Sequence, residues 1–309
     1  MNLKQAKYIK TIAECRSITE AARKLYVSQP SLSKMLLQIE ADIGLTLFDR
    51  SVSPFTITFA GEQYLAAAEK IIAANEQLEN QLREIKKEHF GKLRLGISVQ
   101  RAMQVMPLVI PIFQIRYPNV ALELSEGGSA NLEERLHRGD IDLAFAAIES
   151  TSASLTYELI EKETIGILAG RDSDIARRLT AGIPVTLKDA EADRFVSLTQ
   201  GHSVRVVQDK LFRRYGFRPQ MLLQTDSLEV GRRIVLETGS CMLMSNIYVD
   251  DYVRERGGAF FPLADYENNR HFYACYRKDD FLPSYGRDFI KITTEALARE
   301  KESPRRYRR

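Results

Sequence analysis

Apolar residues between positions 18 and 43 recur at helical spacing in two short stretches. A capping box formed by Ser17 and Glu20 predicts the start of a first helix, residues 18–25. A second helix, residues 29–43, would bury one apolar face made of Leu32, Met35, Leu36, Ile39 and Ile43. Two helices separated by so tight a turn predict a helix-turn-helix.

The leading end of the second helix is polar on its other face. Ser28 is the predicted N-cap, and Pro30 is tolerated in the first turn because its missing N–H has no partner there. Short and amide side chains suit base edges and phosphates, so we expect DNA contacts from Ser28, Gln29, Pro30, Ser31, Ser33 and Lys34. On this pattern alone, a small helical domain that binds protein stays open as the alternative.

Residues 61–88 contain no Pro and no Gly after Gly61, and their apolar positions alternate spacings of four and three. This heptad pattern predicts a long helix that pairs with a second copy of itself. The expected dimerisation residues are Ile71, Asn75, Leu78, Leu82 and Ile85. Asn75 would be a polar seam residue that fixes the register. The alternative is one amphipathic helix packed on its own domain.

Beyond residue 90, short apolar runs alternate with helical segments, as at Leu93–Ile97, 102–116 and Val120–Leu124. Alternation over this length predicts an α/β domain with mostly parallel strands. The expected division is 1–60 for the helix-turn-helix, 61–90 for the linker helix, 91–300 for the α/β domain and 301–309 for a basic tail.

Composition excludes several classes of protein. The chain has 309 residues, 44% of them apolar and 28% charged, which is typical of soluble globular domains. No apolar run approaches the roughly 20 residues that span a bilayer, and the N-terminus lacks the apolar core of a signal peptide, so we expect a cytoplasmic protein without a membrane partner. Three scattered cysteines and the absence of CxxC or HxxxH spacing predict no disulfide framework, metal site or cofactor.

The formal net charge is only +3, so any affinity for nucleic acid must come from a local patch. Residues 1–58 hold eight Lys or Arg and five Asp or Glu, an excess equal to that of the whole chain. The positive excess therefore lies in the predicted helix-turn-helix unit.

The first 65 or so residues resemble the LysR-type transcriptional regulators. The resemblance rests on Ser17-x-Thr19-x-Ala21-Ala22-x-x-Leu25-x-Val27-Ser28-Gln29-Pro30-Ser31-Leu32-Ser33, on Gln38-Ile39-Glu40-x-x-Ile43-Gly44-x-x-Leu47-Phe48-x-Arg50, and on Thr58-x-Ala60-Gly61. The length and the downstream α/β pattern fit the same family over the entire chain.

The resemblance implies a winged helix-turn-helix, a dimerising linker helix and a C-terminal effector domain similar to type 2 periplasmic binding proteins. That domain would have two subdomains, about 91–162 with 268–300 and about 163–267, with a small-molecule effector between them. Homodimers that assemble into homotetramers are implied as well, with double-stranded operator DNA and RNA polymerase as partners.

The predicted wing departs from the family pattern. After the position of Arg50 the family usually carries a second arginine with a glycine beside it, and here Val52-Ser53-Pro54 stand instead. Arg50 keeps its expected phosphate contact, while a second phosphate contact is missing.

Ligands of open α/β sheets bind beyond the carboxyl ends of the strands, so the strand-to-helix junctions are the candidate site. The expected effector-binding residues are Ser98, Gln100, Arg101, Ser129, Thr199, Gln200, His202, Thr225 and Ser227. Helix N-termini at these junctions suit an anion, and we expect a small anionic metabolite. Ordinary helix caps are the alternative at each junction, since Ser and Thr are favoured there. The resemblance supports Ser98, Gln100, Ser129 and Thr199, which match positions that usually line the family's pocket.

Two further functions compete with this interpretation. Some relatives sense peroxide through a cysteine pair, but Cys241 and Cys275 both lie in apolar runs, where buried thiols are inert. An enzyme on the same fold would need catalytic residues, yet the four histidines are scattered and no nucleophile elbow, P-loop or dinucleotide motif is present. We therefore expect a ligand-switched transcriptional regulator and no enzyme.

Overall fold

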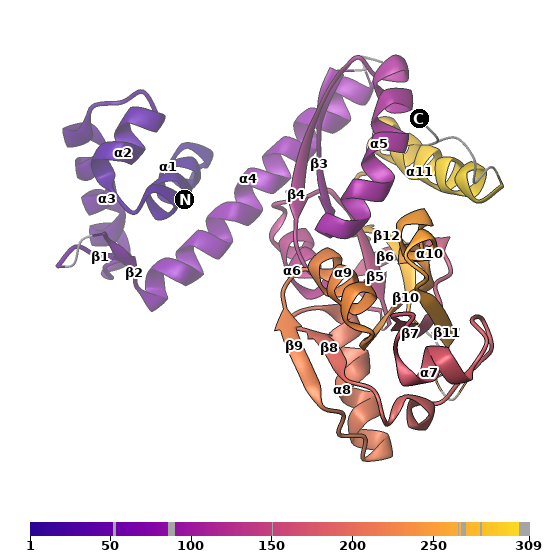
Figure 1. Ribbon diagram of the computed structural model, residues 1–309. Coiled ribbons are helices and arrows are strands. Elements are labelled where there is room, and N and C mark those ends of the chain that lie inside the picture. Colours follow the sequence, from indigo (N-terminus) through magenta and orange to yellow (C-terminus); the bar gives the residue numbers. More distant parts are fainter. Residues whose placement is uncertain are drawn as a thin grey trace.

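The computed structural model describes residues 1–51, 54–85, 90–149, 151–264, 266, 270–278 and 280–302 (Figure 1). Two predictions fall outside these ranges: the wing departure at Val52 and Ser53, and the basic tail beyond residue 302. Within the described ranges, no helix is both long and apolar enough to cross a membrane. Figure 1 shows a small helical unit and a larger α/β unit joined by one long helix.

The N-terminal unit, here called the head, is a winged helix-turn-helix. It comprises α1 (Leu3–Cys15), α2 (Ile18–Lys24), α3 (Gln29–Ile43) and the antiparallel wing strands β1 (Phe48–Asp49) and β2 (Thr56–Ile57). Ser17 Oγ accepts from the Glu20 amide at 3.3 Å and caps α2, while the Glu20 carboxylate pairs with Arg23. The apolar helix faces meet in a core that includes Ile9, Ile12, Leu32, Leu36 and Ile39.

The long helix α4 (Phe59–Ile85) links the head to the α/β unit and begins slightly before the expected Gly61. Its first half packs on α1, where Ala68 and Ile72 are buried together with Ala6. The first half of α4 therefore follows the alternative prediction, a helix that packs on its own chain, because α1 of the head covers it.

The α/β unit contains two five-stranded sheets. The first has the order β4-β3-β5-β12-β6. Its strands are β3 (Phe90–Ile97), β4 (Asn119–Glu126), β5 (Leu143–Ile148), β6 (Leu155–Glu161) and β12 (His271–Arg277). Its helices are α5 (Val99–Arg116), α6 (Ser129–Arg138) and α11 (Ser284–Glu302). Its core includes the fully buried Phe113, Phe145, Phe272 and Phe289.

The second sheet has the order β11-β7-β10-β8-β9. Its strands are β7 (Ile165–Ala169), β8 (Phe195–Leu198), β9 (Met221–Thr225), β10 (Cys241–Ser245) and β11 (Ala259–Pro262). The helices around it are α7 (Asp174–Arg178), α8 (Ser203–Tyr215), α9 (Leu228–Thr238) and α10 (Asp251–Glu255), with the short 3-10 turns η1 (Leu187–Ala190) and η2 (Asn246–Tyr248). It has a separate core, which includes Phe195 and Phe261.

The expectation of mostly parallel strands is wrong for half of the pairings. β3 lies parallel to β4 and β5, and β8 lies parallel to β9 and β10. In contrast, β12 is antiparallel to β5 and β6, and β7 is antiparallel to β10 and β11. The physical reason is that the chain passes between the sheets twice. β6 leads out of the first sheet and β12 returns beside it, so the two run in opposite directions.

Candidate DNA-binding end and effector cavity

The leading end of α3 places the predicted DNA-binding residues together on the surface of the head. Ser28, Gln29, Pro30, Ser31 and Lys34 are exposed, and Ser33 is half-buried. Ser28 Oγ accepts from the Ser31 amide at 3.4 Å, so its hydroxyl caps the helix. The remaining side chains of this end are presented outward, as a groove-reading helix requires.

Arg50 is held at the base of the wing by a residue that the sequence analysis missed, Glu40. The buried Glu40 accepts from the Leu47 amide at 2.8 Å and from the Phe48 amide at 3.4 Å, and its second oxygen pairs with Arg50 Nη2. The sequence signal that could have identified Glu40 is its carboxylate on the otherwise apolar face of α3. Arg50 therefore also stabilises the wing, in addition to its predicted phosphate contact.

The predicted dimerisation residues divide into two groups along α4. Ile71 is partly buried beside the α1–α4 contact of its own chain. Asn75 donates to Glu79 Oε1 at 2.9 Å on the same helix. Leu78 and Leu82 keep 53% and 50% of their surface exposed, an unusual state for two leucines one turn apart. The side chain of Ile85 lies outside the described residues.

A cavity of about 360 Å³ lies between the two sheets, where strand ends and helix N-termini of both meet. Six predicted effector residues line it: Ser98, Gln100, Arg101, Ser129, His202 and Ser227. Three predicted residues stand outside its lining, each for a local reason. The Thr199 hydroxyl donates to Asp226, Gln200 is exposed, and Thr225 Oγ1 accepts from the Ser227 amide at 3.2 Å.

The helix N-termini at the cavity differ in how they are capped. Ser227 Oγ accepts from the Val230 amide at 3.3 Å, so at α9 the plain-cap alternative holds. The caps of α5, α6 and α8 are Ser98, Gly128 and His202, and among the described residues none of them has a side-chain cap hydrogen bond. The first turns of these three helices line the cavity, and their N-cap residues supply no side-chain acceptor to the amides there.

Four charged side chains are buried next to the cavity. Arg101 Nη2 pairs with Glu161 Oε2 at 2.5 Å, and its guanidinium carbon lies 3.8 Å from the centre of the Phe272 ring. Arg270 Nη1 pairs with Glu163. Each arginine thus has a carboxylate partner, and the four charges balance.

Arg270 connects the two sheets. It lies just before β12 of the first sheet, and its Nε and Nη2 donate to Ser203 Oγ, at the start of α8 on the second sheet, at 3.2 and 2.9 Å. Sequence reasoning missed Arg270 because its role depends on a contact between distant segments. Tyr248, another missed lining residue, has its pKa raised to about 12, chiefly by burial.

The end of α6 opposite the cavity touches the head and α4. Asp140 Oδ1 lies 3.3 Å from Lys10 Nζ of α1. Gly139 lies against Ala73 of α4, where an added β-carbon would stand 2.5 Å from the alanine methyl. Burial, with a smaller effect of Asp140, raises the pKa of the nearby Glu69. The segment formed by α6 and the two residues after it therefore spans from the cavity between the sheets to the head.

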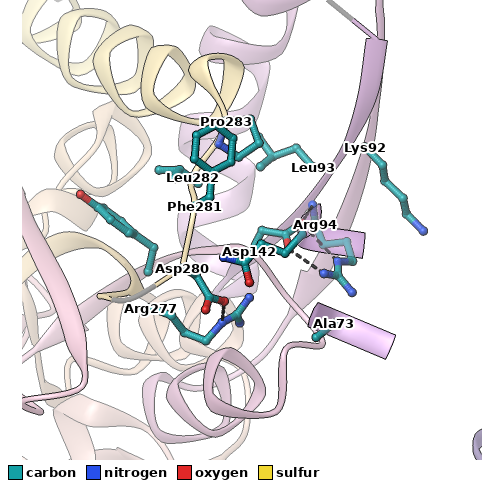
Figure 2. A pocket seen from close by; sticks show the side chains of 12 residues that line it. Ala73, Lys92, Leu93, Arg94, Asp142, Arg277, Asp280, Phe281, Leu282 and Pro283 are labelled. Carbon is teal, nitrogen blue, oxygen red and sulfur yellow. Dashed lines mark hydrogen bonds and ion pairs between the residues drawn. The ribbon is translucent and has the colours of Figure 1, made fainter. Parts of the chain in front are cut away.

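A second contact joins α4 to the first sheet beside a small hollow (Figure 2). Figure 2 shows Arg94 of β3 reaching Asp142, with Ala73 of α4 close by. Arg94 Nη2 lies 2.6 Å from Asp142 Oδ1, and Nη1 lies 2.9 Å from Glu76 Oε2 of α4. This partly buried network fixes the orientation of α4 on the α/β unit.

The two cysteines of the redox-sensing alternative lie in different sheets and are not placed to pair with each other. Cys241 lies in β10 of the second sheet and Cys275 in β12 of the first, and both are free and buried. Burial raises the pKa of both thiols, which makes the reactive thiolate scarce. The geometry therefore disfavours redox sensing by this pair.

A DNA-binding head joined by a helix to a two-sheet ligand-binding unit defines the class of a ligand-responsive gene regulator. Residues 3–62 match the model of the bacterial regulatory helix-turn-helix proteins of the lysR family, and residues 86–298 match the LysR substrate binding domain. The chain belongs to the LysR family. It is a DNA-binding transcriptional regulator with an effector-binding domain, and the predicted fold class is confirmed.

Relatives and solved structures agree with this assignment. YcgK of Bacillus subtilis, an uncharacterized HTH-type transcriptional regulator, is 26% identical over 96% of this chain and 95% of its own. The Hca operon transcriptional activator HcaR of Escherichia coli is 25% identical over 96% and 99%. The crystal structure of full-length CbnR with its target DNA has a TM-score of 0.64 at 19% identity, over 96% of this chain and all of that one, and supports the fold. These relatives are regulators and not enzymes, as expected.

Proposed function

We propose that a small anionic metabolite binds in the cavity between the two sheets and switches how the head engages operator DNA. The observation that carries this proposal is the set of three helix N-termini, from both sheets, that open on one cavity without a side-chain cap in the described ranges. Uncapped amides and the positive end of the helix dipole attract an anion. A ligand held by both sheets favours their closed arrangement.

The charges around the cavity favour a ligand with one negative charge over a ligand with two. Both cavity arginines already have buried glutamate partners, so neither brings an uncompensated positive charge. Glu126 and Asp226 add negative charge to the wall. The anion is therefore met by helix amides and by the hydroxyl of Ser98, while the Ser129 hydroxyl orients the first turn of α6 through its bond to the Ala147 carbonyl. A second carboxylate is repelled.

The rest of the cavity wall is apolar. It includes Leu132, Phe145, Leu198, Val204 and Leu228. A volume of about 360 Å³ lies at the small end of ordinary ligand pockets, which range from roughly 300 to 1,000 Å³. These features favour a monocarboxylate with an aromatic or branched apolar body.

We propose that α6 carries the effector signal to the head. Its first residue, Ser129, lines the cavity and donates to the carbonyl of Ala147 at 3.0 Å. Its far end contacts α1 through Asp140 and α4 through Gly139. A helix moves as a rigid element, so a shift at Ser129 on ligand binding changes the contact with Lys10.

We also propose homodimers paired through the second half of α4, where Leu78 and Leu82 are exposed. Two such dimers form the homotetramer. Met103 and Ile115 on α5 are exposed apolar residues that offer a surface for this second contact.

Calorimetry on the full-length protein tests the ligand proposal. The panel consists of aromatic and branched monocarboxylates, each with its neutral amide and its dicarboxylate analogue. We expect saturable binding of a monocarboxylate, with the amide and the dicarboxylate at least about tenfold weaker. Ser98→Ala and Ser129→Ala should each weaken that binding, while the exposed control Gln200→Ala should not. If both serine variants bind a ligand as tightly as the parent, the site lies elsewhere.

A further inference from the structure

The turn between α2 and α3 contains a tyrosine in an unusual backbone conformation. Tyr26 has a φ of 54°, in the left-handed region, and among the described non-glycine residues only Arg16 shares that property. The Val27 amide donates to the Ala22 carbonyl at 3.0 Å, and the Tyr26 amide donates to the Arg23 carbonyl at 3.2 Å. These two bonds are the Schellman pattern that closes a helix C-terminus. The turn therefore requires a left-handed residue at position 26.

A tyrosine is a costly choice for that requirement. Glycine, and less often asparagine, occupies this position in most helix caps because a β-carbon is strained at positive φ. The tyrosine ring recovers nothing by burial, since 95% of the residue's surface is exposed. No contact of the ring within the described chain explains its presence. Backbone strain kept without an internal benefit is typical of residues that contact a partner.

The position of Tyr26 identifies the partner. It stands two residues before Ser28, the cap of α3, whose first turn carries the exposed Gln29 and Ser31 at the groove-reading end. When the N-terminus of a recognition helix enters the major groove, the turn before it lies near the sugar–phosphate backbone at the groove edge. Tyrosine hydroxyls are regular donors to phosphate oxygens. The Schellman turn fixes the backbone at position 26, which lowers the backbone entropy that this contact costs.

We infer that Tyr26 is a further DNA-contacting residue, whose hydroxyl donates to a backbone phosphate beside the major groove and whose ring packs on the adjoining deoxyribose. This inference rests on the DNA binding of the head and extends it to a residue outside the recognition helix. Because phosphate and sugar are the same in every sequence, Tyr26 contributes to affinity and position rather than to base choice.

The test compares the full-length parent with Tyr26→Phe, Tyr26→Asn and the control Tyr252→Phe in α10. Fluorescence anisotropy measures Kd on a random-sequence 40-bp duplex and on a site recovered by selection from genomic DNA. We expect Tyr26→Phe to weaken binding to both duplexes by roughly five- to tenfold, as the loss of a hydrogen bond to a charged group predicts. Tyr26→Asn should weaken both further, and Tyr252→Phe should weaken neither.

Thermal unfolding separates this role from a structural one. Asparagine tolerates the left-handed conformation, so Tyr26→Asn should unfold at the same temperature as the parent or higher, although it binds DNA more weakly. The inference is overturned if both Tyr26 variants bind both duplexes within twofold of the parent, an outcome that would point to a protein partner. If the Tyr26 variants bind only the selected site more weakly, Tyr26 contacts a base and the proposed phosphate contact is wrong. A parent that binds neither duplex overturns the DNA-binding assignment itself.

Discussion

At the scale of single residues, Glu40 is the side chain on which the wing depends. It accepts two backbone amides, of Leu47 and Phe48, and pairs with Arg50. Removing a charged acceptor leaves buried donors without a partner, which costs about 1–3 kcal/mol. We therefore predict that Glu40→Ala lowers the free energy of unfolding of the head by this amount in urea titrations. Glu62→Ala, at an exposed position of α4, is the control, and an equal loss in both variants would contradict the assignment.

Substitutions on α3 should show how the affinity for DNA divides between base contacts and phosphate contacts. Lys34→Ala should weaken binding to all sequences alike and lower the slope of log K against log salt by about one unit. Gln29→Ala and Ser33→Ala should cost about 1–3 kcal/mol at one base position each. Anisotropy titrations over a salt series measure both effects. Unchanged operator binding in both of the latter variants would refute the assignment.

The sequence predicted residues whose roles are local and missed those whose roles are not. Ser17 and Ser28 cap helices because the acceptor and the donor lie three positions apart, so spacing alone identified them. Arg270 acts through Ser203, a residue far away in the chain, and no local pattern encodes that contact. Thr199 satisfies the same junction pattern as Ser98, but its hydroxyl is taken by Asp226.

At the scale of elements, α6 is the helix whose two ends connect the two functional regions. We predict that Asp140→Asn changes operator affinity although Asp140 belongs to the α/β unit, because the variant loses the ion pair with Lys10 of α1. Partly exposed pairs of this kind contribute about 0.2–1 kcal/mol, so the expected change is up to about fivefold. Lys10→Gln should change the operator affinity of the Asp140→Asn variant less than it changes that of the parent, because the ion pair is already broken in that variant.

The matched control for this cycle is Asp209→Asn, which breaks the pair with Arg205 on α8, remote from the head. Anisotropy on one operator duplex measures all five proteins: the parent, the two single variants of the cycle, the double variant and Asp209→Asn. If Asp140→Asn behaves like Asp209→Asn, α6 does not communicate with the head.

The second half of α4 is the proposed site of homodimer formation. Leu78→Asp with Leu82→Asp places two charges where the exposed leucines are proposed to meet a second copy, so sedimentation velocity should show monomers. The double variant Gln63→Asp with Lys70→Asp puts two acids on exposed positions of the same helix and should sediment like the parent. Intact dimers in the leucine variant would place the interface elsewhere.

The helical elements were predictable because their signals are local. The periodicity of residues 29–43 and the heptad pattern after Gly61 each define a helix without reference to the rest of the chain. The direction of strands was not predictable in the same way. β12 lies between β5 and β6 because the chain leaves the first sheet and returns after the whole second sheet has been formed, and no local pattern records that path.

At the scale of the whole molecule, two sheets with separate cores are joined at two crossings and by Arg270. Because each core is complete, the sheets can move relative to each other without unfolding. A ligand that contacts both can shift their arrangement only by its difference in affinity for the two states, commonly about 1–3 kcal/mol. The head is tied to the first sheet through α4 and the end of α6, and we propose that this shift reaches the DNA-binding surface by that route.

Sequence-specific binding of DNA by the head can be measured without knowing the operator in advance. Full-length protein is incubated with fragmented genomic DNA, the bound fragments are sequenced, and Kd is measured for the best fragment and for its scrambled version at one salt concentration. We expect a small set of sites with two related half-sites, bound at least about 10³-fold more tightly than the scrambled duplex. Uniform recovery of fragments, with equal Kd for site and scramble, would contradict it.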